Sequence, residues 1–210
     1  MIIHVDDEDK FCYVEIAKAG ISSIKYELFW KRRFGALYKK EGMHRTMDLM
    51  KKNSLKPYKE YFKFTVIRNP YTRFMSAYFW GINKQHRKNL DLCRMLDIED
   101  WPDKILNDPN EFLNNVSKDI LTRNPHTTLQ TYLLPKNLNE LDYIGQLEKI
   151  EAVERKLSQF LDEEIKFEHL NKGQEINYYS IDINTDIFNH IFAEDYETLK
   201  DFYKPLKKAK

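Results

Sequence analysis

Residues 11–34 constrain the fold more than any other stretch of this sequence. Residues 11–16, Phe-Cys-Tyr-Val-Glu-Ile, form a run of β-branched and aromatic side chains that is typical of a buried strand. Residues 17–20 interrupt this run with small residues, a lysine and a glycine. From Ile21 onward, hydrophobic residues recur at the spacing of an α-helix. The order of strand, short loop and helix predicts a βα unit with a tight turn between its two elements.

The residues of this turn are suited to holding an anion. The first N–H groups of a helix have no partner inside the helix and lie at the positive end of its dipole, so a phosphate can bind there. Gly20 allows close approach of the backbone, Lys18 supplies a positive charge, and Ser22 and Ser23 supply hydroxyl donors. The lysine precedes the glycine, whereas in G-x-x-x-x-G-K-[ST] it follows the second glycine, which disfavours a metal–triphosphate site. An ordinary βα turn in which Ser22 only caps the helix remains the alternative.

Composition limits the class of protein. The chain has 210 residues, 42% of them hydrophobic and 32% charged, with a net charge of +1, and we expect a single domain over residues 1–210. This balance argues against a nucleic-acid partner.

Cys12 and Cys93 cannot form a disulfide framework, and no Cys/His cluster indicates a metal. The absence of a signal pattern and of a long apolar run predicts a cytoplasmic chain without a membrane span, or a fragment whose targeting segment was removed.

A second strand–helix unit follows at residues 62–78. Residues 62–67 form a hydrophobic run, Arg68 ends it, and Pro70 stands where the first position of a helix is expected. Arg68 would lie at the carboxyl end of a strand, where open α/β sheets bind ligands, and Ser76 about two turns into the helix. A guanidinium and a hydroxyl placed in this way can hold a second phosphate. The alternatives are an ion pair for Arg68 and a packing role for Ser76.

These two stretches carry a resemblance to a known family. Residues 17–23, Ala-Lys-Ala-Gly-Ile-Ser-Ser, resemble the 5′-phosphosulfate loop of the sulfotransferase superfamily, commonly Pro-Lys-x-Gly-[Ser/Thr]-[Ser/Thr]-Ser. Residues 64–78 resemble its 3′-phosphate element, Arg-[Asp/Asn]-Pro-x-x-Arg-x-x-Ser-x-Tyr. The first match departs from the family at Ala17, where proline is usual, and at Ile21, where a hydroxyl residue is common.

Later segments are similar to the carbohydrate branch of the same superfamily. Residues 126–130 resemble its His-x-x-x-Gln element, and residues 141–148 its Tyr-Asp-x-Ile-Gly-x-x-Glu segment, a strand that leads into a helix. Residues 193–197 resemble its Tyr-x-x-Asp-[Phe/Tyr] ending. Independently of the family, hydrophobic spacing predicts an amphipathic helix over residues 150–161, and we expect C-terminal helices over residues 186–193 and 196–203.

The resemblance implies a fold and an activity. The fold would be α/β and P-loop-like, with three layers and a central, mainly parallel sheet flanked by helices. The activity would be transfer of a sulfuryl group from 3′-phosphoadenosine 5′-phosphosulfate (PAPS) to a hydroxyl or amine, most naturally of a glycan or another hydroxylated small molecule, without a metal. A nucleotide-dependent kinase of P-loop type and a non-catalytic nucleotide-binding protein of the same fold remain the alternatives.

The resemblance also assigns roles to individual residues. Lys18 would stabilise charge on the bridging oxygen as the donor bond breaks. Arg68 and Ser76 would bind the 3′-phosphate, and a late basic loop with Lys172 and Gly173 would cover the nucleotide. The full set of predicted donor-binding residues is Lys18, Ala19, Gly20, Ile21, Ser22, Ser23, Arg68, Ser76, Lys172 and Gly173.

The acceptor hydroxyl requires a general base. In the superfamily this base is a histidine or a glutamate, often from the interval between the two phosphate elements. His44 and Glu41 occupy that interval here, and we expect His44 to be the base. His126 is the rival because its local pattern is similar to that of the family, although a histidine at this place can also orient substrate or pack.

Overall fold

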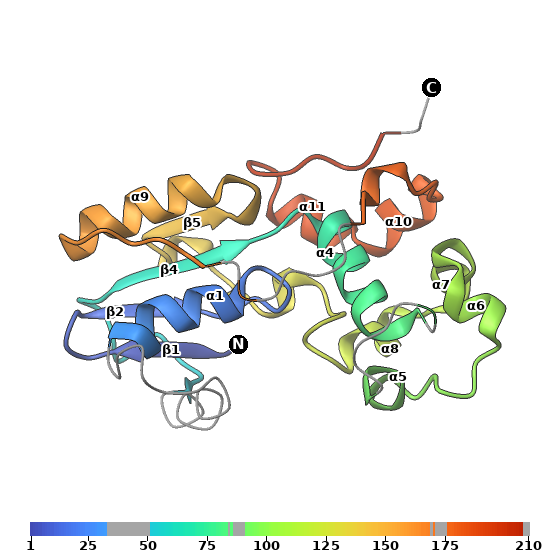
Figure 1. Ribbon diagram of the computed structural model, residues 1–210, viewed down its shortest axis with the longest axis horizontal. Coiled ribbons are helices and arrows are strands. Elements are labelled where there is room, and N and C mark those ends of the chain that lie inside the picture. The colour runs from blue at the N-terminus through green and yellow to red at the C-terminus, as the bar shows by residue number, and fades with distance from the viewer. Residues whose placement is uncertain (33–50, 84, 86–90, 169, 171–175, 208–210) are drawn as a thin grey trace. The chain divides into compact units, whose positions relative to one another are not determined.

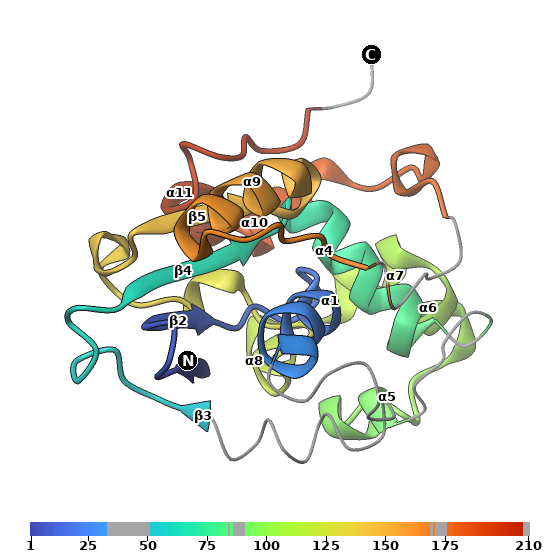
Figure 2. The ribbon, with the colours of Figure 1, turned by 60° about the vertical axis from the view of Figure 1, so that its left-hand side comes forward.

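The computed structural model describes residues 1–32, 51–83, 85, 91–168, 170 and 176–207 (Figures 1 and 2). They fall into two compact units, and each is described by itself. Unit 1 comprises residues 1–68 and 133–172, and unit 2 comprises residues 69–132 and 173–210. The prediction of a single domain over residues 1–210 remains a prediction.

The strands of unit 1 form one sheet. In the described residues it has the order β3-β1-β2-β4-β5, and its central pairs, β2–β4 and β4–β5, are parallel. β1 runs antiparallel to both β2 and β3. The predicted α/β fold with a central, mainly parallel sheet flanked by helices is confirmed. The strands are β1 (Ile3–Asp6), β2 (Phe11–Val14), β3 (Lys51–Lys52), β4 (Phe62–Ile67) and β5 (Tyr143–Gln146).

The register of the parallel strands determines where their loops emerge. Val14 of β2 lies opposite Thr65, and Ile67 of β4 lies opposite Gln146 of β5. The buried Thr65 hydroxyl donates a hydrogen bond of 2.8 Å to the Val14 carbonyl, which ties the ends of β2 and β4 together. The carboxyl ends of the three parallel strands therefore meet at one edge of the sheet.

Within unit 1, helices follow two of these strands. After β2, α1 (Ile21–Lys25) continues directly into a π-helix, η1 (Tyr26–Lys31). After β5, a 3-10 turn, η5 (Leu147–Lys149), leads into α9 (Ile150–Leu161), which has the bounds predicted from its hydrophobic spacing. The π-helix was not predicted: residues 27–30 are buried in succession, a pattern that a 3.6-residue repeat does not indicate.

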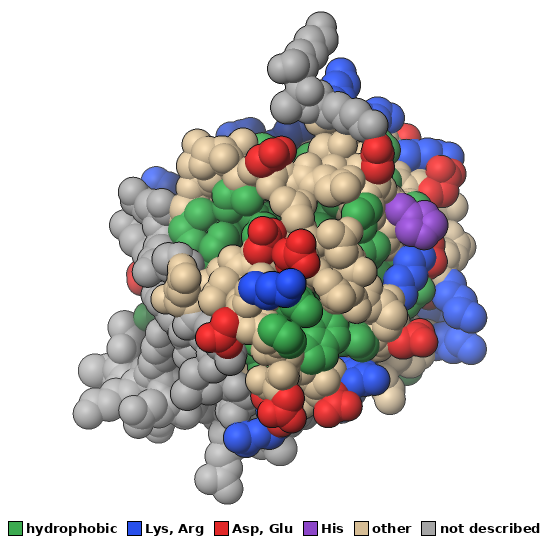
Figure 3. All heavy atoms as spheres, turned by 90° about the vertical axis from the view of Figure 1, so that its right-hand side faces the viewer, with side chains coloured by type: hydrophobic (Ala, Val, Ile, Leu, Met, Phe, Trp, Pro, Cys, Tyr) green, Lys and Arg blue, Asp and Glu red, His purple; other side chains and the backbone are tan. Residues whose placement is uncertain are grey.

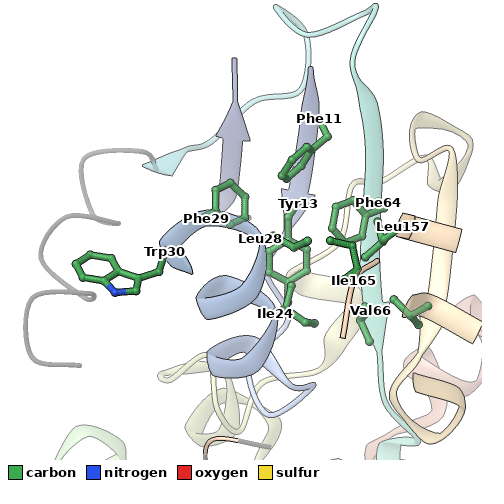
Figure 4. Packing of buried hydrophobic residues seen from close by; sticks show 11 residues of the cluster. Phe11, Tyr13, Ile24, Leu28, Phe29, Trp30, Phe64, Val66, Leu157 and Ile165 are labelled. Carbon is green, nitrogen blue, oxygen red and sulfur yellow. The ribbon is translucent and has the colours of Figure 1, made fainter. Parts of the chain in front are cut away.

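One face of the sheet carries the hydrophobic core of unit 1. Phe11, Tyr13 and Phe64 point from their strands toward Ile24 and Leu28 of the α1–η1 helix (Figure 4). α9 packs on the same face through other members of the cluster. Because burying one large apolar side chain contributes about 1.5–3 kcal/mol, this cluster is a main source of stability for the unit. It consists of Phe11, Tyr13, Ile24, Leu28, Phe29, Trp30, Phe64, Val66, Val153, Leu157 and Ile165.

The described part of unit 2 is helical. Asn69 caps its first helix, because its side chain accepts hydrogen bonds from the backbone N–H groups of Tyr71 and Thr72, and Pro70 takes the first helical position as predicted. Aromatic rings of the first helix and of the C-terminal helices pack together, as in the contacts of Phe74 with Phe188 and Phe192. The helices are α4 (Pro70–Ala77), η2 (Tyr78–Ile82), α5 (Asp91–Leu96), α6 (Asp103–Asn107), α7 (Pro109–Asn115), α8 (Lys118–Thr122), η3 (Gln130–Tyr132), η6 (Tyr178–Ser180), α10 (Thr185–Ile191) and α11 (Ala193–Thr198).

The surface charges are mixed. On the face drawn in Figure 3, Lys and Arg side chains are interspersed with Asp and Glu side chains around hydrophobic patches. This agrees with the near-neutral composition of the chain.

Candidate functional site

The loop between β2 and α1 makes a tight turn through two left-handed residues. Lys18 has a φ of 66°, and Gly20, the N-cap of α1, has a φ of 83°. A Cβ atom on Gly20 would also lie 2.9 Å from the tip of the Leu147 side chain at the start of η5, which would have to shift, so the positive φ is the main reason that this position favours glycine. Because the N-cap is Gly20, the alternative in which Ser22 caps the helix is wrong, and Ser22 lies in the first turn instead.

The backbone of this loop presents donors at the start of the helix. The Ala19 N–H donates to the Ile16 carbonyl at 3.2 Å and closes the turn, and the Ile24 N–H donates to the Gly20 carbonyl at 3.1 Å. The N–H groups of residues 21–23 precede this first helical bond and have no acceptor within the helix. They belong to the same turn as the Ser22 and Ser23 hydroxyls and follow Lys18 in the chain, and N–H groups at the start of a helix with neighbouring hydroxyls are suited to an anion.

Arg68 lies next to this loop. It follows the last residue of β4, and its Nη1 atom donates a hydrogen bond of 3.1 Å to the Lys18 carbonyl. A guanidinium has five N–H donors, and this bond uses one of them. The structure thus brings together the two elements of unit 1 that the sequence separately indicated as phosphate ligands.

A third segment reaches the start of α1 from the far end of unit 1. The backbone N–H of Leu170 donates to the Ser23 Oγ atom at 3.4 Å. The chain just before the predicted late basic loop therefore contacts the turn between β2 and α1. Lys172 and Gly173 themselves lie outside the described residues.

A buried charge network supports the turn and was missed from the sequence. The Glu15 Oε2 atom lies 2.6 Å from His4 Nε2 on β1 and 3.1 Å from Lys25 Nζ on α1. Burial by itself raises the pKa of Glu15, but the hydrogen bond from His4 and the charge of Lys25 together lower it to about 2. Glu15 is therefore an ionised carboxylate at the exit of β2. The sequence feature that could have indicated this network is the carboxylate of Glu15 at the end of a buried strand run.

The remaining predicted site residues belong to unit 2 or lie outside the described chain. Ser76 is half-buried on α4. His126 is also half-buried, and its ring packs against Trp80 with a centroid distance of 4.6 Å and an interplanar angle of 42°. His44 and Glu41 lie outside the described residues, and His44 as the general base stays a prediction.

Two further residues of unit 2 were not assigned a role from the sequence. Arg73 is 1% exposed and donates hydrogen bonds to backbone carbonyls of the segment that contains His126. Asp195 is fully buried and accepts hydrogen bonds from backbone N–H groups of the same segment. Both fall inside stretches quoted above for the family resemblance, but a motif alone does not reveal which residues it contacts.

The described residues hold neither a metal cluster nor a membrane-crossing helix. In that part of the chain, no group of three or more His, Cys, Asp and Glu side chains is arranged to hold a metal ion. None of the described helices combines the length and apolar character needed to cross a membrane.

The features of unit 1 define an α/β protein with a βα loop suited to an anion at the carboxyl edge of its parallel strands. The model of the family described as "Sulfotransferase family" matches residues 2–204. Because this match covers almost the whole chain, the protein belongs to the sulfotransferase family, and sulfuryl transfer is its general activity. No curated protein and no solved structure matches the chain.

Proposed function

We propose that the chain transfers a sulfuryl group from PAPS to a hydroxyl or amine of an acceptor, with a carbohydrate as the acceptor class. The observation that carries this proposal is the hydrogen bond of 3.1 Å from Arg68 to the Lys18 carbonyl. It joins the arginine proposed for the 3′-phosphate to the loop proposed for the 5′-phosphosulfate. PAPS carries both groups on one nucleoside, so its binding calls for two such elements close together.

The loop of unit 1 would hold the 5′ end of the donor. The N–H groups at the start of α1, with the hydroxyls of Ser22 and Ser23, would bind the phosphate, and Gly20 would let it approach the backbone. When bound, the donor supplies the sulfuryl group. Lys18 would stabilise negative charge on the oxygen that leaves, because a fixed cation stabilises charge that develops in the transition state.

Arg68 and Ser76 would bind the 3′-phosphate. A guanidinium forms charge-assisted hydrogen bonds with phosphate, and a hydroxyl adds a further donor. This phosphate distinguishes the proposed donor from AMP and ATP. In the same proposal, Lys172 and Gly173 cover the nucleotide.

A general base would remove the proton from the acceptor hydroxyl. We propose His44 for this role, with Glu41 and His126 as alternatives. A positioned base contributes roughly 10²–10⁴ to the rate, so a His44→Ala variant with full turnover would exclude His44.

Donor recognition can be tested by thermal unfolding without metal. Adenosine 3′,5′-bisphosphate and AMP, which differ only in the 3′-phosphate, would be compared at equal concentration. At about 100 times the Kd, a bound ligand stabilises the folded state by roughly 2.7 kcal/mol. We expect a large shift of Tm with the bisphosphate and a small one with AMP. Equal shifts, or no shift with either ligand, would contradict the proposed donor.

The Arg68→Ala variant makes this test specific. Its shift with the bisphosphate should fall toward the shift with AMP, because the variant lacks the guanidinium that binds the 3′-phosphate. Arg123→Ala is the matched control, because Arg123 is an exposed arginine outside the proposed donor site. It should keep the full difference between the two ligands.

A further inference from the structure

Three segments that are distant in the sequence meet in the interior of unit 2. They are the Arg73 position on α4, residues 125–131, and Asp195 on α11. Arg73 and Asp195 are 1% and 0% exposed, respectively. Ionisable side chains are rarely buried to this extent unless polar partners compensate the loss of water.

Arg73 holds one side of the 125–131 segment. Its Nη1 atom donates to the Thr128 carbonyl at 2.6 Å, and its Nη2 atom donates to the Pro125 carbonyl at 2.9 Å. His126 lies between these two acceptors in the chain. Because a guanidinium is planar and rigid, two simultaneous bonds fix the orientation of both carbonyls.

Asp195 holds the other side of the same segment. Its Oδ2 atom accepts from the Gln130 N–H at 3.1 Å, and its Oδ1 atom accepts from the Thr131 N–H at 2.9 Å. Burial raises the pKa of the Asp195 carboxyl, and the charge of Arg73 and these two N–H groups oppose the rise. The guanidinium of Arg73 therefore binds carbonyls of the segment, and the carboxyl group of Asp195 binds its backbone N–H groups.

The ring of His126 is held by the same helix that carries Arg73. Trp80 lies in η2, which continues α4 without a break, and its ring packs against the imidazole of His126. The backbone N–H of His126 also donates to the Asn124 Oδ1 atom at 2.9 Å. The helical run from α4 through η2 thus contacts both the backbone on either side of His126, through Arg73, and its ring, through Trp80.

We propose that Arg73 and Asp195 are positioning residues, which fix the 125–131 segment so that His126 is presented to the acceptor in one orientation. The part of this proposal that concerns the acceptor rests on the proposed sulfotransferase function. Neither residue touches a reacting atom in this account; both act through the backbone on either side of His126.

Two conservative variants test the proposal. Arg73→Lys keeps the charge but cannot reproduce the rigid pair of bonds, and Asp195→Asn keeps the shape but replaces one acceptor oxygen by a donor NH₂ group. Arg123→Lys is the matched control, because Arg123 is exposed, precedes the same segment and bonds to the Leu96 carbonyl instead. Far-UV circular dichroism and a cooperative melt would show whether each variant folds.

The first readout is the NMR signal of the His126 imidazole in histidine-labelled protein, assigned with a His126→Gln variant. The indole of Trp80 should displace this signal upfield in the wild-type chain and in Arg123→Lys. In Arg73→Lys and Asp195→Asn it should move toward the position of an exposed histidine. An unchanged signal in either folded variant, or a wild-type signal without displacement, would overturn the proposal.

The second readout separates the two proposals. Both variants should keep the Tm shift with adenosine 3′,5′-bisphosphate but lose roughly 10- to 100-fold in kcat, because a small misplacement of a group that orients a substrate has effects of this size. Unchanged kcat and acceptor KM in a variant whose imidazole signal has moved would contradict the acceptor role of His126. If the wild-type chain shows no bisphosphate shift, the proposed function fails, while the NMR result still decides the positioning of the segment.

Discussion

At the scale of single residues, the loop after β2 departs from ordinary backbone geometry. Lys18 is a non-glycine residue with a φ of 66°. Such conformations cost about 1–3 kcal/mol and persist where the surroundings impose them, often at functional sites. The Arg68 bond to the Lys18 carbonyl is one contact that holds this residue in place.

We expect Lys18→Ala to lower kcat by roughly 10²–10³, because the variant lacks the cation that stabilises charge in the transition state. Turnover of PAPS with a glycan acceptor measures the effect. The exposed Lys56 of unit 1 provides the control, and Lys56→Ala should leave kcat unchanged. Equal kcat for the Lys18 variant and the wild-type chain would remove Lys18 from the mechanism.

Gly20→Ala should destabilise the folded chain and weaken binding of the bisphosphate. The left-handed conformation costs an L-residue about 1–2 kcal/mol, and the added Cβ would approach Leu147 to 2.9 Å. Urea unfolding measures the change in free energy. In a Leu147→Ala background the cost of Gly20→Ala should be smaller, since only the backbone term remains. An identical cost in both backgrounds would show that the contact with Leu147 contributes nothing.

At the scale of elements, the His4–Glu15–Lys25 network connects β1, the exit of β2 and α1. Its position explains how a loop with two left-handed residues can be held by the strands and helix on either side. The network also couples the loop to pH, because the pKa of Glu15 in the folded state is about 2 and its ordinary value is 4.5.

The sign of this coupling follows from the lowered pKa. A carboxyl whose pKa is lower when folded stabilises the fold above its unfolded pKa, and this contribution is lost as the pH falls toward the folded value. The contribution of Glu15 is about 3 kcal/mol for a shift of this size. It should be complete above about pH 4.5 and disappear toward pH 2.

The variant Glu15→Gln tests this coupling. Urea unfolding of the wild-type chain and the variant should give a large difference in stability at pH 6, which shrinks as the pH is lowered below 4.5. Glu151→Gln, at an exposed position on α9, should show no such pH-dependent difference. A difference between wild type and Glu15→Gln that stays constant with pH would contradict the lowered pKa.

At the scale of the whole molecule, much of the site in unit 1 follows from local sequence patterns. The strand run, the glycine and the helical spacing predicted the βα turn, and Asn69 and Pro70 together predicted where α4 begins. These features are local, because a cap or a turn depends on residues within a few positions of one another. The family match over residues 2–204 agrees with the motifs found in both units.

The sequence by itself predicted the βα turn after the first long strand run, the start of α4 and the family, and it carries the residues that we propose for anion binding in the first turn. Only the tertiary structure decided that Arg68 binds the Lys18 carbonyl, that the Leu147 side chain lies against Gly20, and that Arg73 and Asp195 hold opposite sides of one segment. These residues are far apart in the chain. Their contacts depend on strand register and helix packing, which bring distant residues together and leave no periodic pattern in the sequence.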